Sequence, residues 1–220
     1  MPENYKTKLV LFDLDGTLID TAPDFLLSLN NVLNKYGKES VTIDEIRMHI
    51  SEGSAKLIKF CFKVDYGDKN FEQYKSDFLL EYKNNLNIES KLFDGIKSLL
   101  DHLDQKSIMY GIVTNKYYEY AQPLVKSFPE LENIKIIICP DHVSNTKPDP
   151  EGILLACNKL NVRPEETVYL GDHQNDLKAG LSAGTKIIGC QYGYSLQKDL
   201  SNTFDCPFVK KVSEIMSNID

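Results

Sequence analysis

Two aspartates stand two residues apart near the start of the chain, directly after a short apolar run. Asp13 and Asp15 follow Leu9–Phe12, and Gly16 then permits a backbone turn. Side chains two residues apart on an extended backbone face the same way, so both carboxylates can reach one site. Crowded carboxylates are unfavourable unless a cation or a proton relieves them. The pair therefore indicates metal-ion or acid–base chemistry, with an ordinary acidic turn or helix cap as the alternative.

Hydroxyl, amide and ammonium groups follow other parts of the chain. Thr114, Asn115 and Lys116 come directly after the apolar run Ile108–Val113, and a hydroxyl and an amide there can bond phosphate oxygens. Lys147 lies in the proline-rich stretch Asn-Thr-Lys-Pro-Asp-Pro, where a restrained lysine suits a fixed positive charge facing a phosphate. A common turn and a solvent-facing lysine are the alternative interpretations.

A second acidic pair follows the run Val168–Leu170. Asp172 stands at the end of that run, and Asp176 lies four residues later, where a helix begins. This spacing can present both carboxylates on one side. Capping of the helix by Asp176 is the competing interpretation, because a helix N-terminus favours negative charge. His173 lies between the two aspartates and could contact a leaving group, or take no part.

The apolar runs predict the elements that position these groups. Continuous apolar segments are typical of strands in a parallel sheet that is covered on both faces. The five predicted strands are Leu9–Phe12, Ile108–Val113, Ile134–Cys139, Val168–Leu170 and Lys186–Cys190, and helical patterns span Phe93–Leu103 and Glu151–Leu160. The alternation predicts an α/β fold with a doubly wound, Rossmann-like parallel sheet. Such sheets bind ligands at the carboxyl ends of their strands, where the polar groups fall.

One interval interrupts the alternation. Between the first two strands, apolar residues recur at helical spacing in two stretches, Phe25–Tyr36 and Phe71–Tyr82. A crossover needs only one helix, so we expect an inserted α-helical cap domain at 18–89 and an α/β core domain formed by 1–17 and 90–220. The alternative is a set of helices packed on the sheet.

Composition excludes several classes of function. The chain has 220 residues with 25 basic and 32 acidic side chains, a net charge of −7, which argues against nucleic-acid and polybasic membrane partners. No run is long enough for a membrane helix or a signal peptide, and no phosphate-binding GxxxxGK[ST] loop occurs. Five cysteines without a CxxC pair predict buried free thiols and a reducing compartment, the cytoplasm: Cys61, Cys139, Cys157, Cys190 and Cys206.

The segment Asp-Leu-Asp-Gly-Thr-Leu resembles the first motif of the haloacid dehalogenase superfamily, whose members are mostly Mg²⁺-dependent phosphatases and phosphotransferases. Thr114, Lys147 and the Gly-Asp-His-Gln-Asn-Asp segment are similar to its later motifs and stand in the same order. The resemblance covers the chain from about Lys8 to Gly193.

The resemblance implies an aspartyl-phosphate mechanism. Asp13 would attack phosphorus, and Asp15 would protonate the leaving alkoxide and then deprotonate the attacking water. Thr114, Asn115 and Lys147, with backbone N–H groups around Gly16, would hold the phosphate oxygens.

The balance of charges implies a divalent cation. Four carboxylates and a phosphate are negatively charged, and only Lys147 and possibly Lys116 oppose them with positive charge. Oxygen ligands favour Mg²⁺. By resemblance, the metal residues are Asp13, Asp15 through its carbonyl, Asp172 and, directly or in support, Asp176.

The segment Asp-Thr-Ala-Pro-Asp-Phe at 20–25 is similar to the phosphoglycolate phosphatase subgroup, which implies a small phosphomonoester as substrate. Relatives often carry a Gly-x-Gly turn in the cap, whereas this chain has Ser-Glu-Gly-Ser at 51–54, so phosphoglycolate itself is not singled out. Candidate cap contacts to substrate are Arg47, Ser54 and Lys56; solvated helix residues are the alternative.

Three other functions stay open at this point. One is a phosphosugar mutase of the β-phosphoglucomutase type, although Pro-Asp-Phe at 23–25 stands where those mutases usually place a histidine. Another is pyrophosphatase or nucleotidase activity, and the third is a non-catalytic binding role. The chain is expected to act as a monomer or a homodimer.

Overall fold

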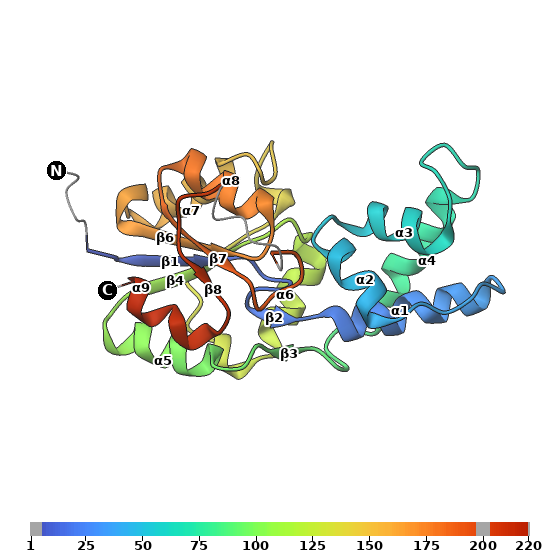
Figure 1. Cartoon of the computed structure of the whole chain (residues 1–220), viewed down its shortest axis with the longest axis horizontal. Helices are drawn as coiled ribbons and strands as arrows, with labels where there is room; N and C mark the ends of the chain where they lie inside the picture. Colours follow the sequence, from blue (N-terminus) through green and yellow to red (C-terminus); the bar gives the residue numbers. More distant parts are fainter. Residues whose placement is uncertain (1–5, 197–202, 220) are drawn as a thin grey trace. The chain divides into compact units, whose positions relative to one another are not determined.

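A computed structural model describes residues 6–196 and 203–219. The chain divides into two compact units, the described parts of Met1–Ile19 with Leu92–Asp220, and Asp20–Lys91 (Figure 1). Two short strands lie where the chain passes from one unit to the other. These are β2 (Ile19–Asp20) and β3 (Lys91–Leu92), which pair as a separate two-stranded sheet.

The first unit is built on a six-stranded sheet in the order β5-β4-β1-β6-β7-β8. Its strands are β1 (Leu9–Phe12), β4 (Met109–Val113), β5 (Ile137–Ile138), β6 (Thr167–Gly171), β7 (Lys186–Cys190) and β8 (Phe208–Val209). All neighbouring strands run parallel, and Phe12 at the end of β1 is level with Ile112 on one side and Leu170 on the other. Because the chain moves outward from β1 through β4 and later returns to β6, the strand order reverses beside β1, which is the ligand-binding position in such sheets.

Helices cover both faces of this sheet. They are α5 (Ile96–Gln105), α6 (Tyr118–Lys126), α7 (Glu151–Leu160), α8 (Gln174–Ala183) and α9 (Met216–Ile219), with 3-10 turns η1 (Pro129–Leu131), η2 (Pro140–His142), η3 (Pro164–Glu166) and η4 (Val212–Glu214). Figure 1 shows α7 and α8 over one face and α5 and α9 over the other. The strands between them are almost wholly buried, and this confirms the predicted doubly wound α/β fold.

Some predicted boundaries were wrong. The strand predicted over Ile134–Cys139 contains only Ile137–Ile138, although the N–H of Lys135 still bonds the carbonyl of Tyr110 in β4. The helix predicted from Phe93 begins at Ile96, because Gly95, with a φ of 92°, turns the chain immediately before it.

Several elements were not predicted, and α6 and β8 show why. The helix α6 contains Pro123, and an internal proline weakens the helical signal of a sequence. The strand β8 has two residues and is too short to produce a periodic pattern.

The second unit is helical, with α1 (Ala22–Lys35), α2 (Ile43–Ile50), α3 (Ser54–Phe62) and α4 (Phe71–Asn84). Aromatic rings fill the space between these helices. Phe25 of α1 stacks on Tyr82 of α4 with ring centroids 4.2 Å apart, and Phe62 of α3 stacks on Tyr74 of α4 at 4.4 Å. Rings with large apolar faces at helical spacing are therefore what holds α1, α3 and α4 together.

A buried carboxylate fixes the end of this unit to its beginning. Asp24, in the first turn of α1, has no exposed surface. It accepts hydrogen bonds from the N–H of Asn87 at 2.9 Å, from the N–H of Glu89 at 2.7 Å and from the hydroxyl of Ser90. The segment that leads back to the first unit is thereby held at the start of α1.

The five cysteines are free thiols, as expected. Four are buried, and Cys206 is half-buried, which is less than the sequence predicted. Among residues 6–196 and 203–219, no helix is long and apolar enough to span a membrane.

We expect Asp24→Asn to lower the free energy of unfolding by about 2 kcal/mol, because an amide NH₂ would face donors that now meet a carboxylate. The measurement is a urea unfolding curve followed by circular dichroism. Asp44→Asn, at an exposed position in the first turn of α2, is the control with the same change of charge. Equal unfolding midpoints for the two variants would contradict the structural role of Asp24.

Candidate active site

Three adjacent strands deliver polar residues to the same edge of the sheet. Asp13 follows β1, Thr114 follows β4 and Asp172 follows β6. The N–H of Asp13 donates to the carbonyl of Leu170 at 2.8 Å, so β1 remains bonded to β6 up to the aspartate itself. The position of these side chains is therefore set by backbone pairing inside the sheet.

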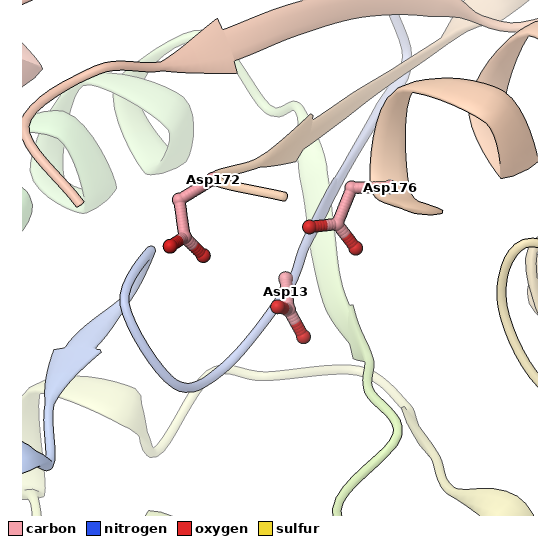
Figure 2. A group of neighbouring side chains, drawn as sticks. All are labelled: Asp13, Asp172 and Asp176. Atoms are coloured by element: carbon pink, nitrogen blue, oxygen red, sulfur yellow. The ribbon is translucent and has the colours of Figure 1, made fainter. Parts of the chain in front are cut away.

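Three carboxylates meet at this edge. Asp13, Asp172 and Asp176 are all buried, and each offers an oxygen within 4.8 Å of the others. Figure 2 shows their carboxylates gathered in one place, with Asp176 coming from the start of α8. Burial, and next the charge of Asp176, raise the pKa of Asp13 to about 7. Burial and the charge of Asp13 likewise raise the pKa of Asp172 well above its ordinary value.

One ammonium group lies against this cluster. The Nζ of Lys147 is 2.8 Å from Oδ1 of Asp13, 2.7 Å from Oδ1 of Asp176 and 2.9 Å from the hydroxyl of Tyr169. Burial by itself lowers the pKa of a lysine, but the charges of Asp13 and Asp176 outweigh it and raise the pKa of Lys147 well above the ordinary value. The three N–H groups of the ammonium thus match three acceptors.

Lys147 is held from two sides. The amide of Asn115 accepts from the backbone N–H of Lys147 at 3.1 Å and donates to its carbonyl at 3.0 Å. Tyr169 donates its hydroxyl hydrogen to the carbonyl of Val113 at 2.8 Å, which fixes the oxygen that receives the lysine. The structure therefore engages the Asn115 side chain with the Lys147 backbone, and a direct role of Asn115 on phosphate stays a prediction.

Tyr169 was missed by sequence reasoning. It lies within the apolar strand β6 and was taken as part of the core, where it is wholly buried. The available signal was its hydroxyl, because a buried tyrosine usually finds a hydrogen-bond partner.

Asp15 lies outside the three-carboxylate cluster. Its carboxylate pairs with Nζ of Lys116, 2.9 Å from Oδ1 and 3.1 Å from Oδ2. The two side chains are 15% and 5% exposed, so the ion pair is largely removed from water. The hydroxyl oxygen of Thr114 accepts the N–H of Lys116 at 3.2 Å. Each of the two aspartates near the start of the chain therefore has its own lysine.

Two glycines allow the chain to pass close to Asp172. A Cβ on Gly16, whose φ is 85°, would lie 2.7 Å from Oδ2 of Asp172, and a Cβ on Gly193 would lie 2.2 Å from the carbonyl oxygen of Gly16. In that space, Asp172 accepts from the Thr17 hydroxyl at 3.2 Å and from the N–H of Tyr194 at 2.8 Å. The first motif and the segment after β7 together hold this carboxylate.

Asp176 also serves the start of α8. Its Oδ2 accepts the N–H of His173 at 2.9 Å, while Nδ1 of His173 accepts the N–H of Asn175 at 3.2 Å. Asp176 therefore caps α8, as one of the two interpretations predicted, and it also contacts Lys147. His173 is engaged in the same cap.

The three candidate cap contacts all lie in the second unit. Arg47, in α2, pairs with Asp20 at 3.3 Å. Ser54 is the first residue of α3. Lys56 is exposed, and its Nζ lies 3.5 Å from Oε1 of Glu52. Contact of these side chains with a substrate stays a prediction.

Comparisons with known proteins agree with this arrangement. A family model described as haloacid dehalogenase-like hydrolase matches residues 10–190. The chain is 37% identical to the N-acetylmuramic acid 6-phosphate phosphatase of Pseudomonas putida, over 93% of this chain and 92% of that protein. It is 33% identical to the phosphoglycolate phosphatase of Xanthomonas campestris, over 87% of this chain and 86% of that protein.

Solved structures show the same fold. The crystal structure of a predicted phosphoglycolate phosphatase from Haemophilus somnus superposes with a TM-score of 0.86 and 26% identity, covering 97% of this chain and 98% of that one. A haloacid dehalogenase-like protein from Bacteroides fragilis superposes with a TM-score of 0.83 and 26% sequence identity, covering 96% of this chain and 100% of that one. The family match extends over β1, β4, β5, β6 and β7, the strands that carry or adjoin the site, and the chain belongs to the haloacid dehalogenase-like hydrolases.

Proposed function

We propose that this hydrolase is a Mg²⁺-dependent phosphatase that cleaves small phosphomonoesters through an aspartyl-phosphate on Asp13. The observation that carries the proposal is the buried group of Asp13, Asp172 and Asp176 with the ammonium of Lys147 in contact with it. A negatively charged cluster of this kind, at the carboxyl ends of parallel strands, suits a cation and a phosphate together.

The donor set fits Mg²⁺. Its atoms are all oxygens, and the raised pKa values of Asp13 and Asp172 indicate carboxylates that lack enough positive charge. Asp13 and Asp172 would hold the ion with the backbone carbonyl of Asp15, and Asp176 would add a carboxylate directly or through water. When bound, the ion offsets the charges of the carboxylates and of the substrate phosphate.

The remaining chemistry belongs to the side chains. A carboxylate oxygen of Asp13 attacks phosphorus, the bond between phosphorus and the ester oxygen breaks, and Asp15 gives a proton to that oxygen. Asp15 then takes a proton from the water that hydrolyses the acyl phosphate, which releases phosphate and restores Asp13. Lys147, Thr114 and the backbone N–H groups near Gly16 stabilise the charge on the phosphate oxygens.

The substrate class is inferred from the relatives. N-acetylmuramic acid 6-phosphate and phosphoglycolate are both phosphomonoesters of primary alcohols, and both carry a carboxylate. We propose a substrate with these features for this chain, and we propose Asp20–Lys91 as the cap domain that selects the leaving group. Pro-Asp-Phe at 23–25 favours release of phosphate over a mutase reaction, because this stretch, where mutases of this type usually place a histidine, includes Asp24, a buried carboxylate bonded to 87–90. The free cysteines favour a reducing compartment such as the cytoplasm.

Phosphate release from a panel of phosphoglycolate, N-acetylmuramic acid 6-phosphate, sugar phosphates, nucleotides and pyrophosphate tests this function. We expect release that requires Mg²⁺ and falls by at least about 1,000-fold in Asp13→Asn, because the amide is no nucleophile. Asp101→Asn, at an exposed position on α5, is the matched control. Activity that survives in Asp13→Asn would exclude the proposed nucleophile, and phosphate retained on a sugar would identify a mutase.

Thermal stabilisation by Mg²⁺ should depend on pH. Without the ion, the pKa of Asp13 is about 7 in the folded protein and near 4 in the unfolded chain. Between about pH 4 and pH 7 the folded protein therefore keeps a proton on Asp13 that the unfolded chain has lost. The folded protein loses stability as the pH rises through this range. Mg²⁺ binds the ionised carboxylate of Asp13, so its binding should restore the stability that is lost at high pH. We expect Mg²⁺ to raise Tm more at pH 8 than at pH 6 in differential scanning fluorimetry. The difference should shrink in Asp13→Asn, and an equal rise at both pH values would contradict the role of Asp13.

Asn115→Ala should lower kcat by about 10- to 100-fold with a smaller change in KM, because Lys147 would lose the amide that fixes its backbone. Steady-state kinetics on the best substrate of the panel measures the effect. Asn158→Ala, at an exposed position on α7, is the control. A variant that changes KM alone would instead place the Asn115 amide on the substrate.

A further inference from the structure

Asp15 lies in a short turn, residues 14–19, that is closed on itself. The N–H groups of Leu18 and Ile19 both donate to the carbonyl of Leu14, at 3.1 and 3.0 Å. These bonds satisfy backbone groups within the turn and fix its internal shape. The direction in which the turn presents Asp15 therefore depends on the contacts that the turn makes with the rest of the chain.

Tyr192, in the segment after β7, makes one of these contacts. Its hydroxyl donates to the carbonyl of Thr17 at 3.0 Å. Its ring packs edge-on against Phe93, with the ring centroids 5.1 Å apart. The N–H of Phe93 in turn donates to the carbonyl of Leu18 at 3.3 Å. Two successive carbonyls of the turn are thus held by one tyrosine and by the residue on which its ring packs.

The turn is held from both sides of β1. Lys116 follows β4 and binds the carboxylate of Asp15, whereas Tyr192 follows β7 and binds the backbone two residues further along the chain. In the sheet, β4 lies on one side of β1, and β6 and β7 lie on the other. An acid–base residue must stay within hydrogen-bonding reach of the reacting atoms, so a small shift of its backbone slows the reaction.

We propose that Tyr192 is a positioning residue for Asp15, and that its hydroxyl fixes the turn so that the carboxylate of Asp15 meets the ester oxygen of the substrate. This inference rests on the proposed phosphatase function, in which Asp15 gives a proton to the leaving group. Asp13 is fixed separately, by the bond from its N–H to the carbonyl of Leu170 in β6. Loss of the Tyr192 hydroxyl should therefore weaken proton transfer to the leaving group and leave attack by Asp13 largely intact.

The leaving group of the substrate separates these two effects. An alkyl phosphate releases a strongly basic alkoxide that needs a proton, whereas p-nitrophenyl phosphate releases a weakly basic phenolate that needs none. The measurement is kcat/KM with Mg²⁺ on p-nitrophenyl phosphate and on the best alkyl ester of the panel. This constant covers the steps up to release of the leaving group, so hydrolysis of the aspartyl-phosphate does not enter it.

Tyr192→Phe keeps the ring on Phe93 and removes only the hydroxyl. We expect it to lower kcat/KM of the alkyl ester by about 10-fold and that of p-nitrophenyl phosphate by about 2-fold or less. Phe93→Leu removes the ring beside Tyr192 but keeps the N–H that bonds Leu18, and it should reproduce the selective loss in part. The proposal is thus tested by two variants that alter different residues.

Tyr110→Phe is the matched control. The buried hydroxyl of Tyr110 donates to the carboxylate of Asp104 at 3.1 Å, and Tyr110 lies near the amino end of β4, whereas the site lies at the carboxyl ends of the strands. This variant loses one hydrogen bond of the same unit and should leave kcat/KM of both esters as in the wild type.

An equal or larger loss on p-nitrophenyl phosphate in Tyr192→Phe would overturn the proposal, as would no loss on either ester. In both cases Mg²⁺-dependent turnover by the wild type shows that the phosphatase function stands. Absence of turnover of every ester by the wild type refutes both.

Discussion

Repulsion among the carboxylates of Asp13, Asp172 and Asp176 is the constraint on which the site depends. At separations within 4.8 Å, and with an effective dielectric constant near 20, each ionised pair costs about 3.5 kcal/mol or more. The repulsion is opposed by one ammonium, on Lys147, and by the backbone N–H groups of His173 and Tyr194. The cluster is therefore held together by the fold.

The sheet provides the rigidity that this arrangement needs. The strand β1 is central and is paired on both sides, so Asp13 is fixed by backbone hydrogen bonds between β1 and β6. Asp172 directly follows the end of the neighbouring strand β6. Because the order of strands reverses between β1 and β6, the carboxylates lie at the position where sheets of this kind bind ligands.

The sequence was sufficient to predict the α/β sheet, because long apolar runs and helical periodicity are local signals that survive without tertiary information. It was also sufficient to select Asp13, Asp15 and Asp172 as candidates, because they follow predicted strands, and Lys147, because prolines restrain the stretch around it. It was not sufficient to find what holds them. Asn115 and Lys147 are 32 residues apart, and Tyr169 and Val113 are 56 apart, so these contacts have no local pattern.

Short or irregular elements were lost for a related reason. The strand β5 keeps only Ile137–Ile138, and β8 has two residues, so neighbouring strands define them more than their own residues do. Asp24 was noted as part of a family-like segment, yet its function inside the second unit depends on Asn87 and Glu89, more than 60 residues later. Residue type indicated the chemistry, and only the folded chain shows the partners.

The contacts made by Tyr194 and Gly193 also order the assembly of the site in time. Asp13 is translated about 180 residues before Tyr194, whose N–H holds Asp172, and before Gly193, which packs on Gly16. A nascent chain therefore exposes Asp13 long before it can bring the other carboxylates against it. Repulsion among the carboxylates therefore arises only after nearly the whole sheet has been translated and can hold them together.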